Sequence, residues 1–241
     1  MSHEIRTPMN AVIGITHLLL EQNPRNDQVD YLKKLQFSSN NLLALINDIL
    51  DFTKIESGKL ELEKIDFDLI AVVKNVHEML SFKANEKAID FHLIINENVP
   101  EKVKGDPVRL SQILLNLLSN AIKFTHQGEV SLTLKMPGNK NGLQRIAFEV
   151  RDTGIGIPED KLKQIFESFS QVSSDTTRKY GGTGLGLAIT KKLVNIFEGR
   201  LSVGSEINKG SCFYVELPFG VADNMDAPSA LEKNGKNEHL N

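Results

Sequence analysis

The stretch NLLSNAIKF, residues 116–124, combines an apolar helical pattern with three polar side chains. Asn116, Asn120 and Lys123 stand at positions i, i+4 and i+7, which places them on one face of a helix. Amide oxygens suit Mg²⁺, and a lysine ammonium suits phosphate. This helix therefore predicts a site for a phosphorylated ligand.

A glycine turn, DTGIGIP at residues 152–158, follows a predicted strand further along the chain. Gly154 and Gly156 would let a ligand approach the backbone closely. The carboxylate of Asp152 can accept a hydrogen bond from an exocyclic amine. Taken alone, the same stretch also fits an ordinary glycine turn at the end of a strand.

A second glycine-rich stretch, YGGTGLGLAI at residues 180–189, leads into a predicted helix. Free N–H groups at a helix start form a site for anions. The chain contains no GxxxxGK[ST] sequence, and this stretch does not match GxGxxG, so neither a P-loop nor a dinucleotide fingerprint is indicated. The long polar segment between the two glycine stretches, residues 159–180, is typical of a lid.

The first 64 residues are expected to form two helices separated by the polar turn EQNPRND, residues 21–27. The second helix begins near Asp27 and carries one apolar stripe. That stripe consists of Leu35, Leu42, Leu45, Ile46, Ile49 and Phe52. Because two helices cannot bury both of their stripes, we expect a second copy to complete a four-helix bundle, which predicts a homodimer.

The stretch HEIRTP, residues 3–8, places a histidine away from the apolar side of the first helix. At about 100° per residue, His3 lies roughly 160° from that side, so a helix would expose it. The apolar side consists of Ile5, Met9, Val12, Thr16 and Leu19. A competing interpretation starts the helix at Thr7 and Pro8, which would leave His3 in a frayed terminus.

From about Asp66 the pattern becomes mixed α and β, which predicts a two-layer α/β sandwich and an α+β fold class for the whole chain. We expect four helices: over 69–87, from Asp106-Pro107 through Phe124, after DTGIGIPED, and from near Thr183. We expect strands over 89–95, 129–136 and 145–152, with a turn at 137–142 between the last two. The stretches RLSVGSE and SCFYVEL should form a closing hairpin. We expect domains at 1–64 and 65–220, followed by a disordered linker at 221–241.

The composition is that of a globular protein, with 40% hydrophobic and 24% charged residues. A net charge of −3 gives no reason to expect nucleic acid or an anionic membrane as a partner. The single cysteine, Cys212, excludes an internal disulfide framework and fits a reducing compartment. We therefore expect a cytoplasmic fragment without membrane contact, and leave open a membrane anchor in a longer parent protein.

The order of these motifs resembles a known family. NLLSNAIKF, DTGIGIP and YGGTGLGLAI resemble the N, G1 and G2 boxes of the GHKL ATP-binding fold, and IFESFSQ (165–171) resembles its F box. HEIRTP resembles the H box of sensor histidine kinases. The amino-acid sequences of these motifs are most similar to those of hybrid-type kinases. The resemblance covers residues 2 to about 219. It favours a real first helix, truncated upstream, over a frayed terminus.

The resemblance implies transfer of the γ-phosphoryl group of ATP to His3, and then to an aspartate of a receiver domain in another chain or later in the same one. Glu4 would accept the imidazole proton, and Thr7 matters for phosphatase activity in the family. Asp152 would bind adenine, and Asn120 would hold Mg²⁺. The implied ATP-binding residues are Asn116, Asn120, Lys123, Asp152, Gly154, Gly156, Arg178, Gly182, Thr183, Gly184, Leu185 and Gly186. Arg178 fits a solvated surface charge about as well as a γ-phosphate contact.

Two other functions share this ATP-binding pattern. Hydrolysing members of the fold resemble one another in carrying a glutamate one turn before the metal-binding asparagine. Asn116 occupies that position here and is a poor base, so a GHKL-fold ATPase is the less favoured reading. A non-catalytic dimerisation scaffold would require broken motifs, and the motifs quoted above are intact.

Overall fold

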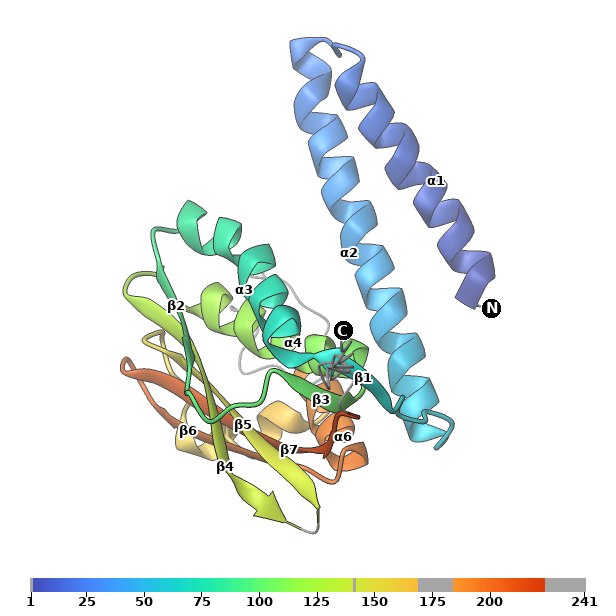
Figure 1. Ribbon diagram of the computed structural model, residues 1–241. Helices are drawn as coiled ribbons and strands as arrows, with labels where there is room; N and C mark the ends of the chain where they lie inside the picture. The colour runs from blue at the N-terminus through green and yellow to red at the C-terminus, as the bar shows by residue number, and fades with distance from the viewer. Residues whose placement is uncertain (1, 141, 169–183, 224–241) are drawn as a thin grey trace, which may run out of the picture.

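The computed structural model describes residues 2–140, 142–168 and 184–223, and only the backbone of Ser2, His3 and Lys140. It has two parts, a helical hairpin that projects from a compact α/β domain (Figure 1). Within the described residues no helix is both long and apolar enough to cross a membrane.

The hairpin consists of α1 (Ser2–Glu21) and α2 (Asn26–Glu56), which confirms the two expected helices. The second helix begins one residue earlier than expected, because the backbone N–H of Arg25 donates to Oε1 of Gln28 and closes the first turn. The two helices pack antiparallel, and Nη2 of Arg6 donates to Oδ1 of Asn47 across the pair at 3.3 Å.

A seven-stranded sheet forms one layer of the second domain. Its strands are β1 (Ile65–Asp68), β2 (Asp90–Ile95), β3 (Lys102–Gly105), β4 (Glu129–Lys140), β5 (Leu143–Asp152), β6 (Arg200–Glu206) and β7 (Gly210–Val221). The order is β1-β3-β7-β5-β4-β2, and β6 pairs with β7. The β2–β4 pair is parallel and the other pairs are antiparallel, so the sheet is mixed.

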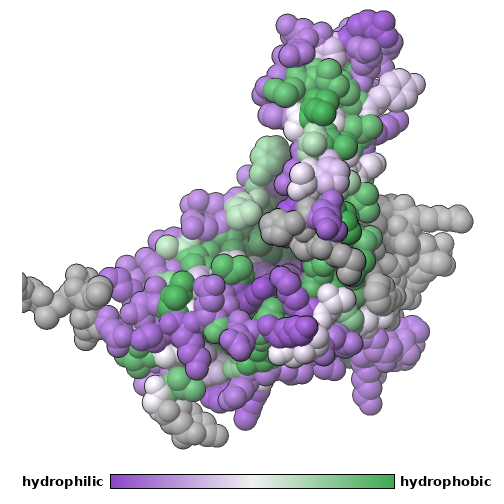
Figure 2. Space-filling model, turned by 90° about the vertical axis from the view of Figure 1, so that its right-hand side faces the viewer, coloured by the Kyte–Doolittle hydropathy of each residue, from purple (hydrophilic) through white to green (hydrophobic). Residues whose placement is uncertain are grey.

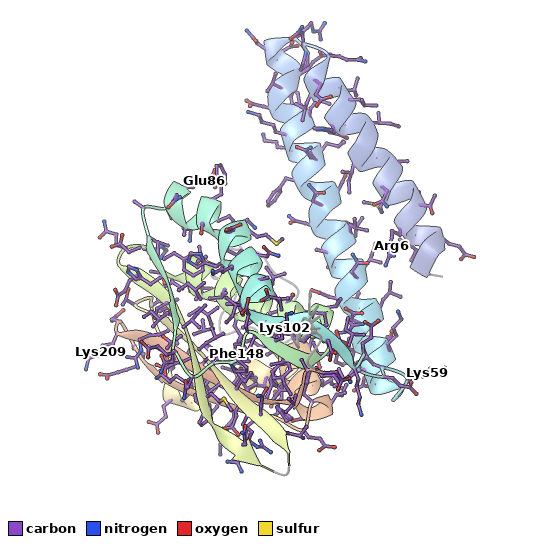
Figure 3. All side chains as sticks on the ribbon, viewed as in Figure 1. Arg6, Lys59, Glu86, Lys102, Phe148 and Lys209 are labelled. Atoms are coloured by element: carbon purple, nitrogen blue, oxygen red, sulfur yellow. The ribbon has the colours of Figure 1, made fainter. Side chains whose placement is uncertain are left out.

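The other layer, as far as the structure describes it, consists of α3 (Leu69–Glu86), α4 (Pro107–Phe124) and α6 (Gly186–Ile196). Alternate residues of β4 point into the core, because successive strand residues face opposite sides. Phe148 of β5 lies fully buried beneath the helices, where Figure 3 labels it. The two-layer α/β sandwich expected from the pattern is confirmed.

The expected turn at residues 137–142 is wrong in extent. Pro137 lacks the N–H that a ladder needs, and a bulge between Lys135 and Gly138 takes it out of the pairing. Pairing then resumes, with Gly138 opposite Arg145, so both strands continue to a much shorter connection.

The helix expected after DTGIGIPED is also wrong within the described residues. Two short 3₁₀ turns, Glu159–Lys161 and Gln164–Phe166, occupy this stretch. Ile165 is buried and Phe166 packs against the core, so these short turns are held by apolar contacts. The helix expected from near Thr183 begins at Gly186, where α6 starts.

The foot of α2 contacts the α/β domain through a small polar cluster. Oδ2 of Asp51 accepts hydrogen bonds from Nη1 of Arg109 at 3.2 Å and from Nε2 of Gln112 at 2.8 Å. Lys192 of α6 pairs with Glu56. We call the contact of Asp51 with Arg109 and Gln112 the interdomain clamp. It joins the hairpin to the start of α4.

The hairpin exposes much of its apolar surface, in contrast to the domain below it. In α2, Leu35 and Leu42 are 48% and 47% exposed, and Ile49 is 39% exposed. Hydrophobic residues are visible along the projecting hairpin in Figure 2. The described residues therefore cover the apolar stripe predicted for α2 only in part.

Candidate nucleotide site and phosphoacceptor helix

Helix α4 presents the three polar side chains predicted from its spacing. Asp106 caps its start, because Oδ1 accepts from the backbone N–H of Arg109 at 2.9 Å. The apolar face of α4 is fully buried, which fixes the rotation of the helix. Asn116, Asn120 and Lys123 are half-buried at the boundary of that face, so the structure brings all three to one side of α4.

Asn116 joins α4 to the start of α6. Its Nδ2 donates to the carbonyl oxygen of Gly186 at 3.2 Å and to Oγ1 of Thr190 at 3.4 Å. A Cβ atom at Gly186 would lie 3.4 Å from Oδ1 of Asn116, in van der Waals contact with it. The end of the second glycine stretch thus packs directly against the polar face of α4, a link that spacing alone did not predict.

Asn120 lies one turn further along α4 and differs from Asn116 in its surroundings. Within the described residues its carboxamide makes no hydrogen bond, so its oxygen is available to a ligand. The same part of the chain holds no group of three or more His, Cys, Asp or Glu side chains arranged to bind a metal. Any Mg²⁺ here would depend on phosphate oxygens for most of its ligands, as Mg²⁺ commonly does.

Lys123 completes this face. Its Nζ lies 4.8 Å from the centre of the Phe124 ring, a cation–π distance. Burial lowers the pKa of the Lys123 ammonium, and the nearby positive charge of Lys87 lowers it further. Both effects weaken the charged form, and an anionic ligand beside Lys123 would restore it.

The glycine turn after β5 holds a buried carboxylate. Asp152 is 7% exposed, and its Oδ1 accepts from the backbone N–H of Gly154 at 2.8 Å and of Ser211 at 3.2 Å. Burial raises the pKa of Asp152, while these two N–H donors act in the opposite direction. No hydrogen bond to its second oxygen occurs within the described part of the chain.

The two glycines of this turn are required by close backbone contacts. A Cβ at Gly154 would lie 2.6 Å from the carbonyl oxygen of Phe124, at the end of α4. Gly156 has φ of 70°, and a Cβ there would lie 2.1 Å from the carbonyl oxygen of Glu206. The turn is therefore pressed between α4 and the β6–β7 connection.

The second glycine stretch is described from Gly184 onward. Gly184 has φ of 68°, which favours glycine, and Leu185 is buried at 1% exposure. Gly186 begins α6 beside Asn116. The predicted contacts at Arg178, Gly182 and Thr183 lie outside the described residues, as does most of the predicted lid.

The predicted phosphoacceptor motif lies at the start of α1. His3 belongs to this helix, and its side chain is outside the described atoms. Glu4 and Thr7 are exposed, and Pro8 lies inside a helix that continues without interruption to Glu21. The helix therefore does not start at Thr7 and Pro8, as the competing interpretation required.

Sequence reasoning missed two contributors to the site. The backbone N–H of Ser211 on the neighbouring strand β7 holds Asp152, although the two residues are 59 positions apart in the chain. Lys87 donates to carbonyl oxygens at the end of α4 from the end of α3. A hydrophobic pattern cannot report either contact, because one comes from a backbone group and the other from a lysine in a polar turn.

Comparison with known proteins agrees with this arrangement. Residues 1–58 match the His Kinase A (phospho-acceptor) domain. Residues 105–221 match the family described as histidine kinase-, DNA gyrase B-, and HSP90-like ATPase. A phospho-acceptor helix pair joined to an ATPase domain of this kind defines a histidine kinase catalytic core. The chain belongs to the sensor histidine kinases.

Several relatives match nearly the whole chain. The signal transduction histidine-protein kinase BarA of Escherichia coli (strain K12) is 43% identical over 238 residues, which cover 98% of this chain and 26% of BarA. Hybrid signal transduction histidine kinase A of Dictyostelium discoideum is 44% identical over 97% of this chain and 11% of that protein. The chain thus spans about a quarter or less of the length of these relatives.

A solved structure also matches nearly the whole chain. The crystal structure of full-length ShkA in complex with AMPPNP matches with a TM-score of 0.76 and 38% identity. The match covers 92% of this chain and 45% of ShkA. The fold of helical hairpin and ATP-binding domain is therefore shared with a nucleotide-bound protein.

Proposed function

We propose that this chain is the core of a two-component sensor kinase that transfers the γ-phosphoryl group of ATP to His3 and then to an aspartate of a receiver domain. The observation that carries the proposal is the buried carboxylate of Asp152. Two backbone N–H groups hold one of its oxygens, which fixes the orientation of the other. An oriented acceptor in a buried turn suits the exocyclic amine of adenine.

The triphosphate would extend from the adenine end along the polar face of α4. Lys123 would contact phosphate oxygens, and the backbone from Gly184 to Gly186 would approach them at the start of α6. The oxygen of Asn120 would be the protein ligand of Mg²⁺. When bound, that ion neutralises charge on the phosphates during transfer.

At the phosphoacceptor, a nitrogen of neutral His3 would attack the γ-phosphorus. The bond between that nitrogen and phosphorus forms, the bond from phosphorus to the bridging β–γ oxygen breaks, and ADP leaves with the electron pair. Glu4 would accept the proton from the other imidazole nitrogen. Adjacent helix residues do not face each other, but Pro8 removes the N–H that would bond to the Glu4 carbonyl, which allows a local bend.

The second transfer moves the phosphoryl group to a carboxylate oxygen of a receiver domain and regenerates neutral His3. Thr7 stands four residues from His3, one turn along α1, where its hydroxyl could orient a water that hydrolyses the receiver's phosphoaspartate and releases inorganic phosphate. We place both steps in the cytoplasm and in a homodimer. The exposed stripe of α2 supports the dimer, because pairing with a second copy would remove it from water.

The proposal is tested by adding labelled ATP and a panel of receiver domains to the whole chain. We expect label on the chain first and on a subset of receivers afterwards. Glu4→Gln should slow labelling by about 10²–10⁴-fold if Glu4 is the general base. Thr7→Ala should keep labelling and reduce mainly the dephosphorylation of a cognate receiver.

Each of these outcomes has a contrary result. If the Glu4→Gln variant were labelled at the parental rate, Glu4 would not be the general base. Steady release of inorganic phosphate from ATP, with no labelled chain at any time, would instead support the GHKL-fold ATPase alternative.

A further inference from the structure

The end of α4 is completed by a lysine from another helix. The last four carbonyl groups of an α-helix lack intrahelical partners. In α4 these belong to Ile122, Lys123, Phe124 and Thr125, since the N–H of Thr125 makes the last regular bond, to Ala121.

Lys87 satisfies three of these four carbonyl groups. Its Nζ donates to the carbonyl oxygens of Ile122 at 2.7 Å, Lys123 at 2.9 Å and Thr125 at 3.4 Å. Lys87 directly follows α3, whose last residue, Glu86, is labelled in Figure 3. One side chain from the end of α3 therefore terminates the helix that carries Asn116, Asn120 and Lys123.

The fourth carbonyl joins α4 to the glycine turn. The backbone N–H of Ile155 donates to the carbonyl oxygen of Phe124 at 3.3 Å. Gly154 lies so close to that oxygen that a Cβ would be 2.6 Å from it. Hence Lys87 and the turn that carries Asp152 hold the same helix end from two sides.

The charge of Lys87 also matters at this position. A cation is favoured at a helix C-terminus, where the carbonyl dipoles concentrate negative potential. Burial lowers the pKa of Lys87, and its charge in turn lowers the pKa of Lys123. The carbonyl oxygens of Ile122 and Lys123 offset the cost of burying the Lys87 ammonium.

We propose that Lys87 is a positioning residue of the nucleotide site, which holds the end of α4 so that the ammonium of Lys123 meets the phosphates of ATP. The inference rests on the proposed ATP binding and adds a residue to it. Asp152 has its own anchors in the N–H groups of Gly154 and Ser211. Loss of Lys87 should therefore weaken binding of the phosphates and leave binding of the adenosine portion intact.

The test compares Lys87→Met with Lys83→Met in the whole chain. Lys83 lies one turn earlier on α3, is exposed, and makes no hydrogen bond or ion pair within the described residues. Equilibrium affinity is measured for Mg-ATP and for adenosine, together with the KM and kcat of autophosphorylation. Lys87→Met should weaken Mg-ATP binding and raise KM by about fivefold, the effect of a charge at a helix C-terminus.

The same variant should keep kcat and adenosine affinity within about twofold of the parent, since neither depends on Lys123 meeting the ground-state phosphates. Lys87→Arg, which keeps the charge and the donors, should restore most of the Mg-ATP affinity. Lys87→Gln keeps one donor without the charge. It serves as a milder variant if Lys87→Met does not fold, and should fall between the parent and Lys87→Met.

Two results would overturn the inference. A lower melting temperature with unchanged Mg-ATP affinity in Lys87→Met and Lys87→Gln would make Lys87 a structural cap only. If Lys87→Met weakened the binding of ATP and of adenosine equally, Lys87 would act on the glycine turn that carries Asp152 instead of on Lys123. If the parent chain itself bound no Mg-ATP, the proposed function would fail, which is a different result from either of these.

Discussion

The helical hairpin and the ATP-binding domain bury their apolar residues to different degrees. In the domain, Leu110, Ile113 and Phe148 are completely buried, and helices and sheet share one core. In the hairpin, Leu35 and Leu42 remain nearly half exposed. The domain thus buries its core within one chain, whereas the hairpin requires another surface to cover its apolar residues. Nucleotide binding should then belong to the single chain and dimerisation to the hairpin.

The largest expected effect is on dimerisation, through Ile49→Asp. Each copy would place an unpaired carboxylate in an apolar interface, at a cost of several kcal/mol per ion, so the dimer dissociation constant should rise by at least about 10³-fold. Light scattering measures the mass directly. Ile94→Asp is the matched control, because Ile94 is 49% exposed on an edge strand of the other domain. An Ile49→Asp variant that remains dimeric would show that the apolar stripe of α2 is not the dimer interface.

The next effect is on nucleotide binding. Asp152→Ala and Asn120→Ala should each weaken Mg-ATP by about 2–3 kcal/mol, since each leaves a ligand group without its partner. The increase of melting temperature on adding Mg-ATP should then nearly vanish, because a ligand stabilises the state it binds. Asp30→Ala and Asn40→Ala on the surface of α2 are the controls and should behave as the parent. An unchanged melting shift in Asp152→Ala would show that adenine binds elsewhere.

A smaller effect should follow from pH. In the proposed site, Asp152 accepts a hydrogen bond from adenine in its ionised form, and burial raises the pKa of this group above its usual value. Affinity for Mg-ATP should therefore be full above the raised pKa and should fall by about tenfold per pH unit below it. Asp152→Asn should flatten this dependence. If the pH profile of Mg-ATP affinity were identical in the parent and in Asp152→Asn, Asp152 would not take part in nucleotide binding.

The same shift has a consequence for stability with the opposite sign. Because the folded pKa of Asp152 lies above the unfolded one, the native state binds more protons between the two values. Asp152 therefore lowers the free energy of unfolding as pH rises through this window. Added Mg-ATP should reduce that loss, since it binds the ionised native state.

The smallest effect concerns the interdomain clamp. Asp51 and Arg109 are 24% and 21% exposed, so their ion pair is partly screened by water and should contribute about 0.5–1 kcal/mol. Asp51→Asn should increase the population with separated domains by a few-fold. Distances between spin labels on α2 and β2 would broaden in Asp51→Asn and stay unchanged in Asp30→Asn. An unaltered distribution in Asp51→Asn would mean that apolar contacts alone hold the domains together.

Much of the fold could be predicted from local patterns. The start of α4 followed from Asp106 and Pro107, because capping is a local interaction. Strands β1 and β3 were not predicted, since IDFD and KVKG are four residues long and largely polar. They pair with each other over a long stretch of chain, for example Asp66 with Lys104, 38 positions away, and such partners have no local signal.

The candidate site divides in the same way. Asn116, Asn120 and Lys123 lie on one helix, so their spacing brought them together correctly. The hydrogen bond from Ser211 to Asp152 depends on the pairing of β5 with β7, which spacing cannot supply. Side chains that act within an element were therefore predictable, and contacts between elements needed the structure.

The identity of the phosphoacceptor is the claim that joins the two regions. The whole chain is incubated with ATP labelled at the γ-phosphate, and the stability of the label is measured in acid and in base. We expect an acid-labile, base-stable product, as a nitrogen–phosphorus bond requires. We expect His3→Gln to erase the label while Mg-ATP still raises the melting temperature, and His17→Gln on the same helix to retain it. Label that survives in His3→Gln would show that His3 is not the phosphoacceptor.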